Sequence, residues 1–133
     1  MRTVFLGITI FSILASQVQA ADYNPRWSDL PCQICIERPE EQGILNIRET
    51  TIAIDGKQAF LMIGGQASCA YVAPGKHSIF ASSYDPYDPN SKDPKAWLSN
   101  KMTIDLENVK RVELELRRAK DMKENQWEIE QVQ

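Results

Sequence analysis

The sequence predicts an all-β protein, built as an antiparallel β-sandwich of about seven to eight short strands. Apolar and polar residues alternate with a period of two in several short runs, a pattern typical of strands that bury one face. Glycine or proline interrupts these runs at roughly ten-residue spacing, as in sandwiches and barrels. No segment shows the alternation of strands and helices that is typical of an α/β enzyme.

The beginning of the chain has the pattern of a secretory signal peptide over residues 1–20. Met1-Arg2 supplies a positive start, residues 4–14 form an uncharged, mostly apolar run, and Val18-Gln19-Ala20 places small residues where a cleavage site needs them. The apolar run is too short to span a bilayer, and no cysteine follows the cut to carry a lipid. We therefore expect a periplasmic or secreted protein, without a membrane anchor, in an oxidising compartment.

Charge and length limit what the domain can do. The 133 residues include 15 Lys and Arg against 18 Asp and Glu, a net charge of −3; cleavage leaves 113 residues, and the loss of Arg2 makes the charge −4. This balance argues against binding to nucleic acid or to an anionic membrane, because both need clustered cations. The one basic cluster, within residues 110–118, is interleaved with Glu113 and Glu115, so we expect a charge-paired, solvated strand face.

An irregular lead-in over residues 21–31, which contains two prolines, precedes a single domain over 32–133. The domain opens with a strand in which Cys32, Ile34 and Ile36 point to one side, closed by Pro39. Further strands are expected in 43–55, which ends at the hairpin signal Asp55-Gly56, and then in 59–63, 67–72 and 77–84.

Residues 85–96 contain three Asp-Pro pairs, which predict a long, stiffened loop because proline keeps the preceding residue out of helical geometry. Alternation resumes in 102–107, 112–117 and 127–130. The composition of residues 109–124 also suits a helix, so one short C-terminal helix across 117–125 is the alternative there. The strict alternation in VELELR favours a strand.

The three cysteines are disulfide candidates. Cys32 shares a face with Ile34 and Ile36, and a Cys32–Cys69 bridge is the first expectation, with Cys35–Cys69 as its rival. Cys32 and Cys35 also form a C-x-x-C sequence, but redox activity needs that motif at a helix N-terminus, and here it lies in a strand. Zinc is not expected, because one distant histidine gives no second pair of ligands.

Catalysis is not expected, and no cofactor is implied. His77 is the only histidine and follows a Pro-Gly turn, without the sequence of a nucleophile elbow to pair with it. The oxygens of Asp85, Asp88, Asn90 and Asp93 could be considered for calcium, but their spacing departs from the calcium-binding loop. We therefore predict no metal site.

The Asp-Pro loop is the best candidate for a binding surface. Aromatic side chains on a stiff, exposed loop lose little entropy on binding and often anchor protein interfaces. We expect Tyr84, Tyr87 and Trp97 to supply affinity and Asp85 and Asp88 to supply electrostatic steering. One or two of the aromatic rings could instead fold back on the core.

Three short segments are similar to a known group of proteins. Ile36-Glu37-Arg38-Pro39, residues 51–57 (TIAIDGK) and residues 72–77 (VAPGKH) resemble, in this order, the turn motifs of small bacterial envelope domains of the PEGA-like or transthyretin-like type. The resemblance covers about residues 32–84 and implies a β-sandwich that binds or presents, with no catalytic residues to carry over. Some periplasmic immunity proteins, which neutralise delivered toxins, are similar small acidic sandwiches.

We predict a non-enzymatic protein-binding domain whose partner is a protein, such as a delivered toxin or an envelope component. The sharpest form of this hypothesis is an immunity-type inhibitor. The alternatives are an envelope thiol–disulfide protein that uses its C-x-x-C motif, and a calcium- or glycan-binding module.

Overall fold

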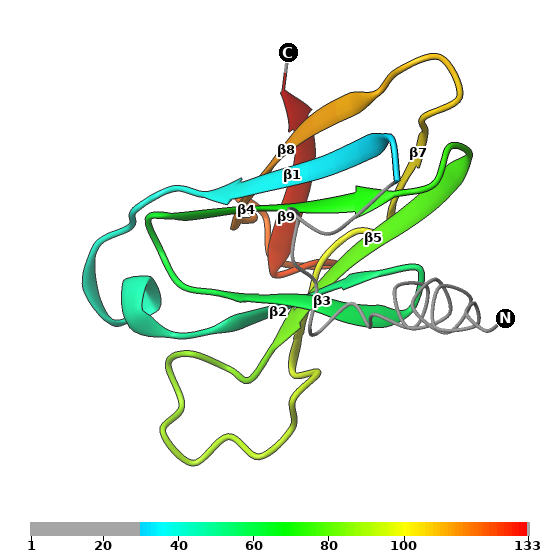
Figure 1. The fold of residues 1–133 in the computed structure, drawn as a ribbon. Coiled ribbons are helices and arrows are strands. Elements are labelled where there is room, and N and C mark those ends of the chain that lie inside the picture. The colour runs from blue at the N-terminus through cyan, green and yellow to red at the C-terminus, as the bar shows by residue number, and fades with distance from the viewer. Residues whose placement is uncertain (1–29, 133) are drawn as a thin grey trace, which may run out of the picture.

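The computed structural model describes residues 30–132 and arranges them as two β-sheets packed face to face (Figure 1). Sheet A has the strand order β4-β1-β8-β9, and sheet B has the order β3-β2-β5-β6, with β7 also paired to β5. The elements are β1 (Cys32–Arg38), the 3-10 helix η3 (Gly43–Ile47), β2 (Thr50–Ile54), β3 (Lys57–Met62), β4 (Gln66–Val72), β5 (Lys76–Ser83), β6 (Trp97–Leu98), β7 (Met102–Asp105), β8 (Arg111–Arg118) and β9 (Trp127–Val132).

The predicted fold class is confirmed. The predicted signal peptide over 1–20 and the lead-in as far as residue 29 lie outside the described residues. Within residues 30–132, no helix is long and apolar enough to cross a membrane. One pairing differs from the antiparallel expectation, because β1 and β8 run parallel. All of sheet B lies between these two strands in the sequence, and so long a connection allows a parallel pairing.

One local prediction is wrong, and one alternative is excluded. Residues 43–47 were expected to belong to a strand but form η3, because Gly43 has a φ of 76°, which breaks the extended chain. The alternative of a short helix across 117–125 does not form. There the amide of Ala119 donates to the carbonyl of Gln126 at 2.9 Å, so a turn-rich loop returns β8 directly into β9.

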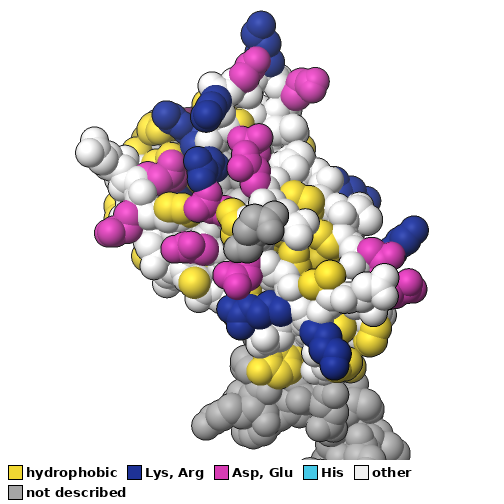
Figure 2. Space-filling model, turned by 90° about the horizontal axis from the view of Figure 1, so that it is seen from above, with side chains coloured by type: hydrophobic (Ala, Val, Ile, Leu, Met, Phe, Trp, Pro, Cys, Tyr) yellow, Lys and Arg dark blue, Asp and Glu magenta, His cyan; other side chains and the backbone are white. Residues whose placement is uncertain are grey.

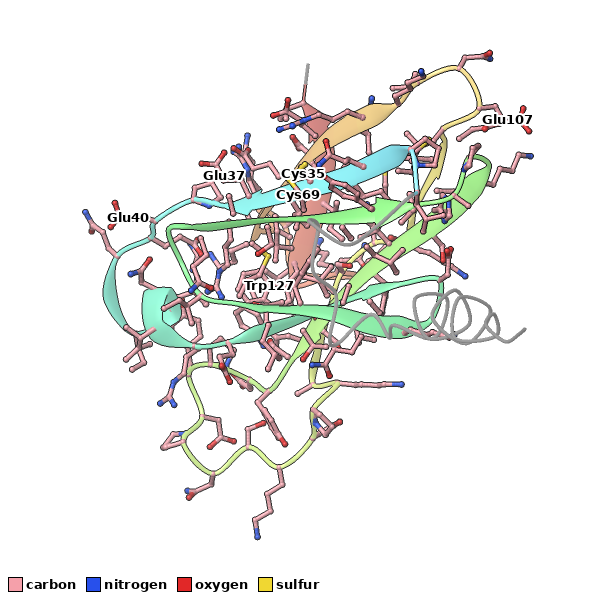
Figure 3. The ribbon with its side chains drawn as sticks, in the orientation of Figure 1. Cys35, Glu37, Glu40, Cys69, Glu107 and Trp127 are labelled. Carbon is pink, nitrogen blue, oxygen red and sulfur yellow. A yellow bond between two sulfur atoms is a disulfide. The ribbon has the colours of Figure 1, made fainter. Side chains whose placement is uncertain are left out.

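Alternation along each strand builds the core between the sheets. Every second residue of β1 and β8 is buried, and the ring of Trp127 lies between the two layers (Figure 3). The outer face of sheet A is solvated: Arg111 and Arg117 pair with Glu113 and Glu115, as predicted. Figure 2 looks down on the top of the view in Figure 1 and shows positive and negative side chains interspersed there. The largest fully buried apolar side chains are Trp127, Ile34, Ile36, Ile52, Met62, Ile79, Leu106, Leu114, Leu116 and Ile129.

A disulfide joins Cys35 of β1 to Cys69 of β4 (Figure 3). The first expectation, Cys32–Cys69, is wrong, and the rival pairing is confirmed. Cys35 and Cys69 are directly opposite in the β1–β4 register, so their side chains share one face of the sheet. Cys32 faces the core instead, where its thiol is free and lies 3.7 Å from the carbonyl oxygen of Leu106.

Two side-chain amides connect the sheets along the edge formed by β9. The Asn100 amide donates to the carbonyl of Ile129 at 3.1 Å and accepts from its N–H at 2.8 Å. Oε1 of the Gln126 side chain accepts from the main-chain amide of Leu98 at 3.0 Å. The main-chain N–H of Gln126 donates to the Leu98 carbonyl at 2.9 Å. These contacts replace a strand ladder between β9 and the β6–β7 connection.

Arg38, the last residue of β1, has its side chain entirely inside the protein, with 0% of its surface exposed. Its guanidinium donates to the carbonyls of Arg48 (2.5 Å), Leu45 (2.5 Å) and Met62 (2.7 Å) and to Thr50 Oγ1 (3.0 Å). Its Cζ also lies 4.8 Å from the centre of the Trp127 ring, in a cation–π contact. Burial lowers the pKa of Arg38, and the nearby Glu41 carboxylate opposes this effect.

Replacing Arg38 by alanine should lower the free energy of unfolding by at least about 3 kcal/mol, because two buried carbonyls and a partly buried one then lose their donor. Urea denaturation of the purified protein measures the change. Arg111→Ala is the matched control: its exposed ion pair with Glu113 should contribute no more than about 1 kcal/mol. Equal losses in the two variants would contradict the stabilising role of Arg38.

The disulfide should contribute about 4 kcal/mol, since it closes a loop with a sequence separation of 34. We expect Cys35→Ala/Cys69→Ala to unfold at a lower urea concentration by this amount. Peptide mapping of the unreduced protein should recover Cys35 linked to Cys69, with Cys32 open to alkylation only after unfolding. Recovery of a Cys32–Cys69 peptide would refute the pairing.

Candidate binding site

The loop between β5 and β6 is a series of turns, each started by an Asp-Pro pair. Asp85, Asp88 and Asp93 each accept, through Oδ1, the amide of the residue two positions on, at 2.9 Å. The carbonyl of each also accepts the amide three positions on, at 3.2, 3.0 and 3.1 Å respectively. Proline at the second position of each turn fixes φ, so side chain and ring together stiffen the loop. The loop projects from the end of β5, away from both sheets (Figure 1).

This use of the carboxylates bears on the calcium alternative. One oxygen of each aspartate is committed to a turn, and the turns direct the three carboxylates to successive backbone amides. No group of three or more His, Cys, Asp or Glu side chains suited to a metal is present in the part of the chain that the structure describes.

The aromatic residues of the loop separate into two environments. Trp97 is only 7% exposed and packs in the core, with its ring 5.5 Å from that of Trp127. The expectation that Trp97 belongs to the exposed contact surface is therefore corrected, because its large ring is buried against Trp127 and holds the end of the loop to the core. Tyr87 covers Trp97 from outside at 5.7 Å, and its hydroxyl accepts from Arg118 at 3.2 Å.

A groove of about 430 Å³ lies between the Asp-Pro loop and the segment that joins η3 to β2. Of the five predicted site residues, Tyr84, Asp85 and Asp88 line it. Tyr87 is about half exposed but does not line the groove, and Trp97 is inside. The structure thus brings together three of the predicted residues.

The far wall of the groove comes from residues that sequence reasoning missed. Ile47, at the end of η3, is 62% exposed, and Tyr84 across the groove is 51% exposed. Ile63, which is half-buried, also lines the groove, as do Arg48 and Glu49. The signal that could have found them is Gly43: a glycine before ILNIR (residues 44–48) indicates a break in the strand, after which Ile44 and Ile47 turn outward.

The groove therefore combines apolar side chains with a mostly acidic rim. The lining carries three carboxylates, Glu49, Asp85 and Asp88, and one cation, Arg48. Tyr84 is held on its main-chain side, since its carbonyl accepts from Ser83 Oγ at 2.7 Å, and that hydroxyl accepts from the indole of Trp127 at 2.8 Å. An exposed ring on a fixed backbone is suited to bind a partner with little loss of conformational entropy.

Comparison of the chain with models of protein families, with curated proteins and with solved structures finds no match.

His77, the residue considered for catalysis, forms part of a tie between two turns. Its Nδ1 lies 2.6 Å from Asp55 Oδ2 and its Nε2 lies 2.7 Å from the Ala73 carbonyl, while Asp55 Oδ1 accepts from the Ser78 amide at 2.9 Å. Both ring nitrogens face acceptors, so the charged imidazolium suits the site. Burial alone would lower the pKa of His77, but the bonds to Asp55 and Ala73 outweigh it and hold the pKa above its ordinary value of 6.5.

The contact with His77 also shifts the pKa of Asp55. Burial would raise the pKa of its carboxyl, but the hydrogen bonds from His77 and from the Ser78 amide hold it below the ordinary value of 3.8. A raised histidine pKa stabilises the fold fully below pH 6.5 and loses that contribution as pH rises through the folded value. A lowered aspartate pKa stabilises above pH 3.8 and is lost as pH falls.

The stability that the tie supplies should therefore decline on the alkaline side. We expect the difference in unfolding free energy between wild type and His77→Gln to be about 1 kcal/mol or less near neutral pH and to shrink as pH rises from about 5.5 to about 8.5. Urea titrations at the two pH values measure it. Lys76→Gln, an exposed neighbour, should show no such trend, and a difference that grew with pH would contradict the protonated tie.

Proposed function

We propose that this protein is an extracytoplasmic, non-enzymatic binding domain that receives a protein partner in the groove between the Asp-Pro loop and η3. The observation that carries the proposal is the pairing of two exposed apolar side chains, Ile47 and Tyr84, across one groove with a charged rim. Large apolar side chains that are rimmed by polar groups mark interaction sites in soluble proteins.

The construction of the groove supports a protein partner. Each turn of the loop is fixed by proline and by an aspartate side chain, and buried Trp97 anchors its end. Such a surface is organised before binding, which reduces the entropy lost in a complex. The acidic rim favours a partner that brings Lys or Arg beside an apolar side chain and steers its approach.

Two independent features support the proposed compartment. The sequence of residues 1–20 predicts export, and the Cys35–Cys69 disulfide is suited to an oxidising environment. An envelope protein or a delivered toxin fits this setting, and an immunity-type inhibitor is the sharpest form of the proposal. A thiol–disulfide function is disfavoured, since Cys35 is bonded to Cys69 and Cys32 faces the opposite side of β1.

Site-specific photo-cross-linking in the cells that produce the protein tests the proposal. With a benzoylphenylalanine in place of Tyr84, irradiation should yield a discrete cross-linked product of higher mass. Addition of Ile47→Asp to the same chain should abolish that product, because a charge then occupies the apolar wall. Ile47 is largely exposed, so this substitution should leave the melting temperature unchanged.

The control places the same photoreactive residue at Val109, which is 45% exposed on the connection between β7 and β8. It should give no product of the same mass. If both positions gave the same product, or if Ile47→Asp left the Tyr84 product undiminished, the groove would not be the binding site.

A further inference from the structure

A second hollow, of about 470 Å³, lies on the outer face of sheet B, opposite the core. Ser78, Phe80 and Ser82 follow one another along the exposed side of β5, and Thr51 of β2 lies directly across from Ser82. Lys95 from the Asp-Pro loop and Lys101 from the β6–β7 connection also line it, as do three residues of the β2–β3 hairpin, Ala53, Gly56 and Gln58. Three hydroxyls, one aromatic ring and two ammonium groups thus line one hollow.

Within residues 30–132, these polar groups form no side-chain contact that the fold needs. Among the described residues, none of the hydroxyls of Thr51, Ser78 and Ser82 forms a side-chain hydrogen bond, and neither lysine forms an ion pair. Phe80 is half-buried yet does not belong to the apolar cluster between the sheets. The ring and its polar neighbours are therefore available to a ligand.

The charge of this hollow is opposite to that of the protein. The chain carries a net charge of −3, but no aspartate or glutamate lines the hollow. Asp55, which adjoins Gly56 of the lining, has its two carboxylate oxygens engaged by His77 and by the amide of Ser78. By contrast, the hollow beside β9 places Lys120 and Lys123 among Asp121, Glu124, Glu128 and Glu130.

The geometry limits the class of ligand. A sheet face offers side chains only, because the main-chain groups of β5 are already paired with β2 on one side and with β6 and β7 on the other. A peptide captured by strand addition needs a free edge and cannot bind here in that way. Ser78 and Ser82 are four residues apart along β5, about 13 Å, so the row suits an extended ligand with several hydroxyl groups.

We propose that the outer face of sheet B binds an anionic saccharide. The hydroxyls of Thr51, Ser78 and Ser82 exchange hydrogen bonds with sugar hydroxyls, and Phe80 packs against the apolar face of a sugar ring. Lys95 and Lys101 bind the acidic groups of the sugar through charge-assisted hydrogen bonds. This site is separate from the proposed protein-binding groove, and each can exist without the other.

Titration of the purified protein with tri-galacturonate, followed by calorimetry and by backbone amide chemical shifts, tests the proposal. We expect saturable binding, with the largest shifts on β2 and β5. Lys95→Gln/Lys101→Gln should weaken the affinity by at least about tenfold, and Phe80→Ala should also weaken it. Both lysines are exposed, so the double variant should keep the wild-type melting temperature.

Matched controls test whether binding requires both the lysines of this hollow and the negative charge of the saccharide. Lys120→Gln/Lys123→Gln removes the same charge from the hollow beside β9 and should change the affinity by less than about twofold. Methyl-esterified tri-galacturonate, which keeps the sugar chain but lacks its charge, should bind at least about tenfold more weakly. Ile47→Asp should leave saccharide binding unchanged, because Ile47 lines the protein-binding groove and not this hollow. A negative result in the cross-linking experiment would therefore not bear on the saccharide proposal.

Four results would overturn the proposal. They are the absence of saturable binding, equal affinity for the methyl ester, an equal loss in Lys120→Gln/Lys123→Gln, and hexaglutamate binding as tight as that of tri-galacturonate. The last result would mean that the hollow recognises negative charge alone and is not selective for a saccharide.

Discussion

The guanidinium of Arg38 connects parts of the sandwich that no strand ladder joins. Its acceptors lie in η3, in the segment before β2, in β2 itself and at the end of β3, while Arg38 belongs to β1 in the other sheet. A charged group is costly to bury unless its hydrogen bonds are satisfied, so these carbonyls must converge on the same point. The position of η3, and with it the wall of the groove that carries Ile47, follows from this requirement.

Tryptophan links that buried cation to the surface. Trp127 stacks against Arg38 on one side and contacts Trp97 on the other, and Trp97 is covered by Tyr87. The indole N–H of Trp127 also fixes Ser83, the residue at which the Asp-Pro loop begins. Both ends of the loop are thus attached to the same side chain. The position of the Asp-Pro loop on the surface is therefore determined by packing at the centre of the core.

Much of this architecture could be predicted from residue patterns, and the failures have physical causes. Alternation identified the strands, and Asp-Pro pairs identified the stiff loop, because both are local properties. The burial of Trp97 depends on Trp127, thirty residues further on, and local patterns carry no such information. The disulfide depends on the parity of β4, which the sequence ASCAYV leaves open: in the structure Ala70 is buried, so its neighbour Cys69 points outward, as Cys35 does and Cys32 does not. The same parity places Arg38 inward with Ile34 and Ile36.

The contact between Asn100 and Ile129 also bears on self-association. In an antiparallel pair, alternate residues direct both main-chain groups away from the partner strand, so on β9 Ile129 presents its N–H and carbonyl to the open side. Asn100 occupies both groups with one amide, and a bridge between Ser99 and Trp127 covers the preceding outward position. Within residues 30–132, a second chain that approached this edge would find Gln131 as the one outward residue of β9 whose main-chain groups are not covered in this way. The side-chain amide of Asn100 thus satisfies main-chain groups of β9 that a neighbouring strand would otherwise pair.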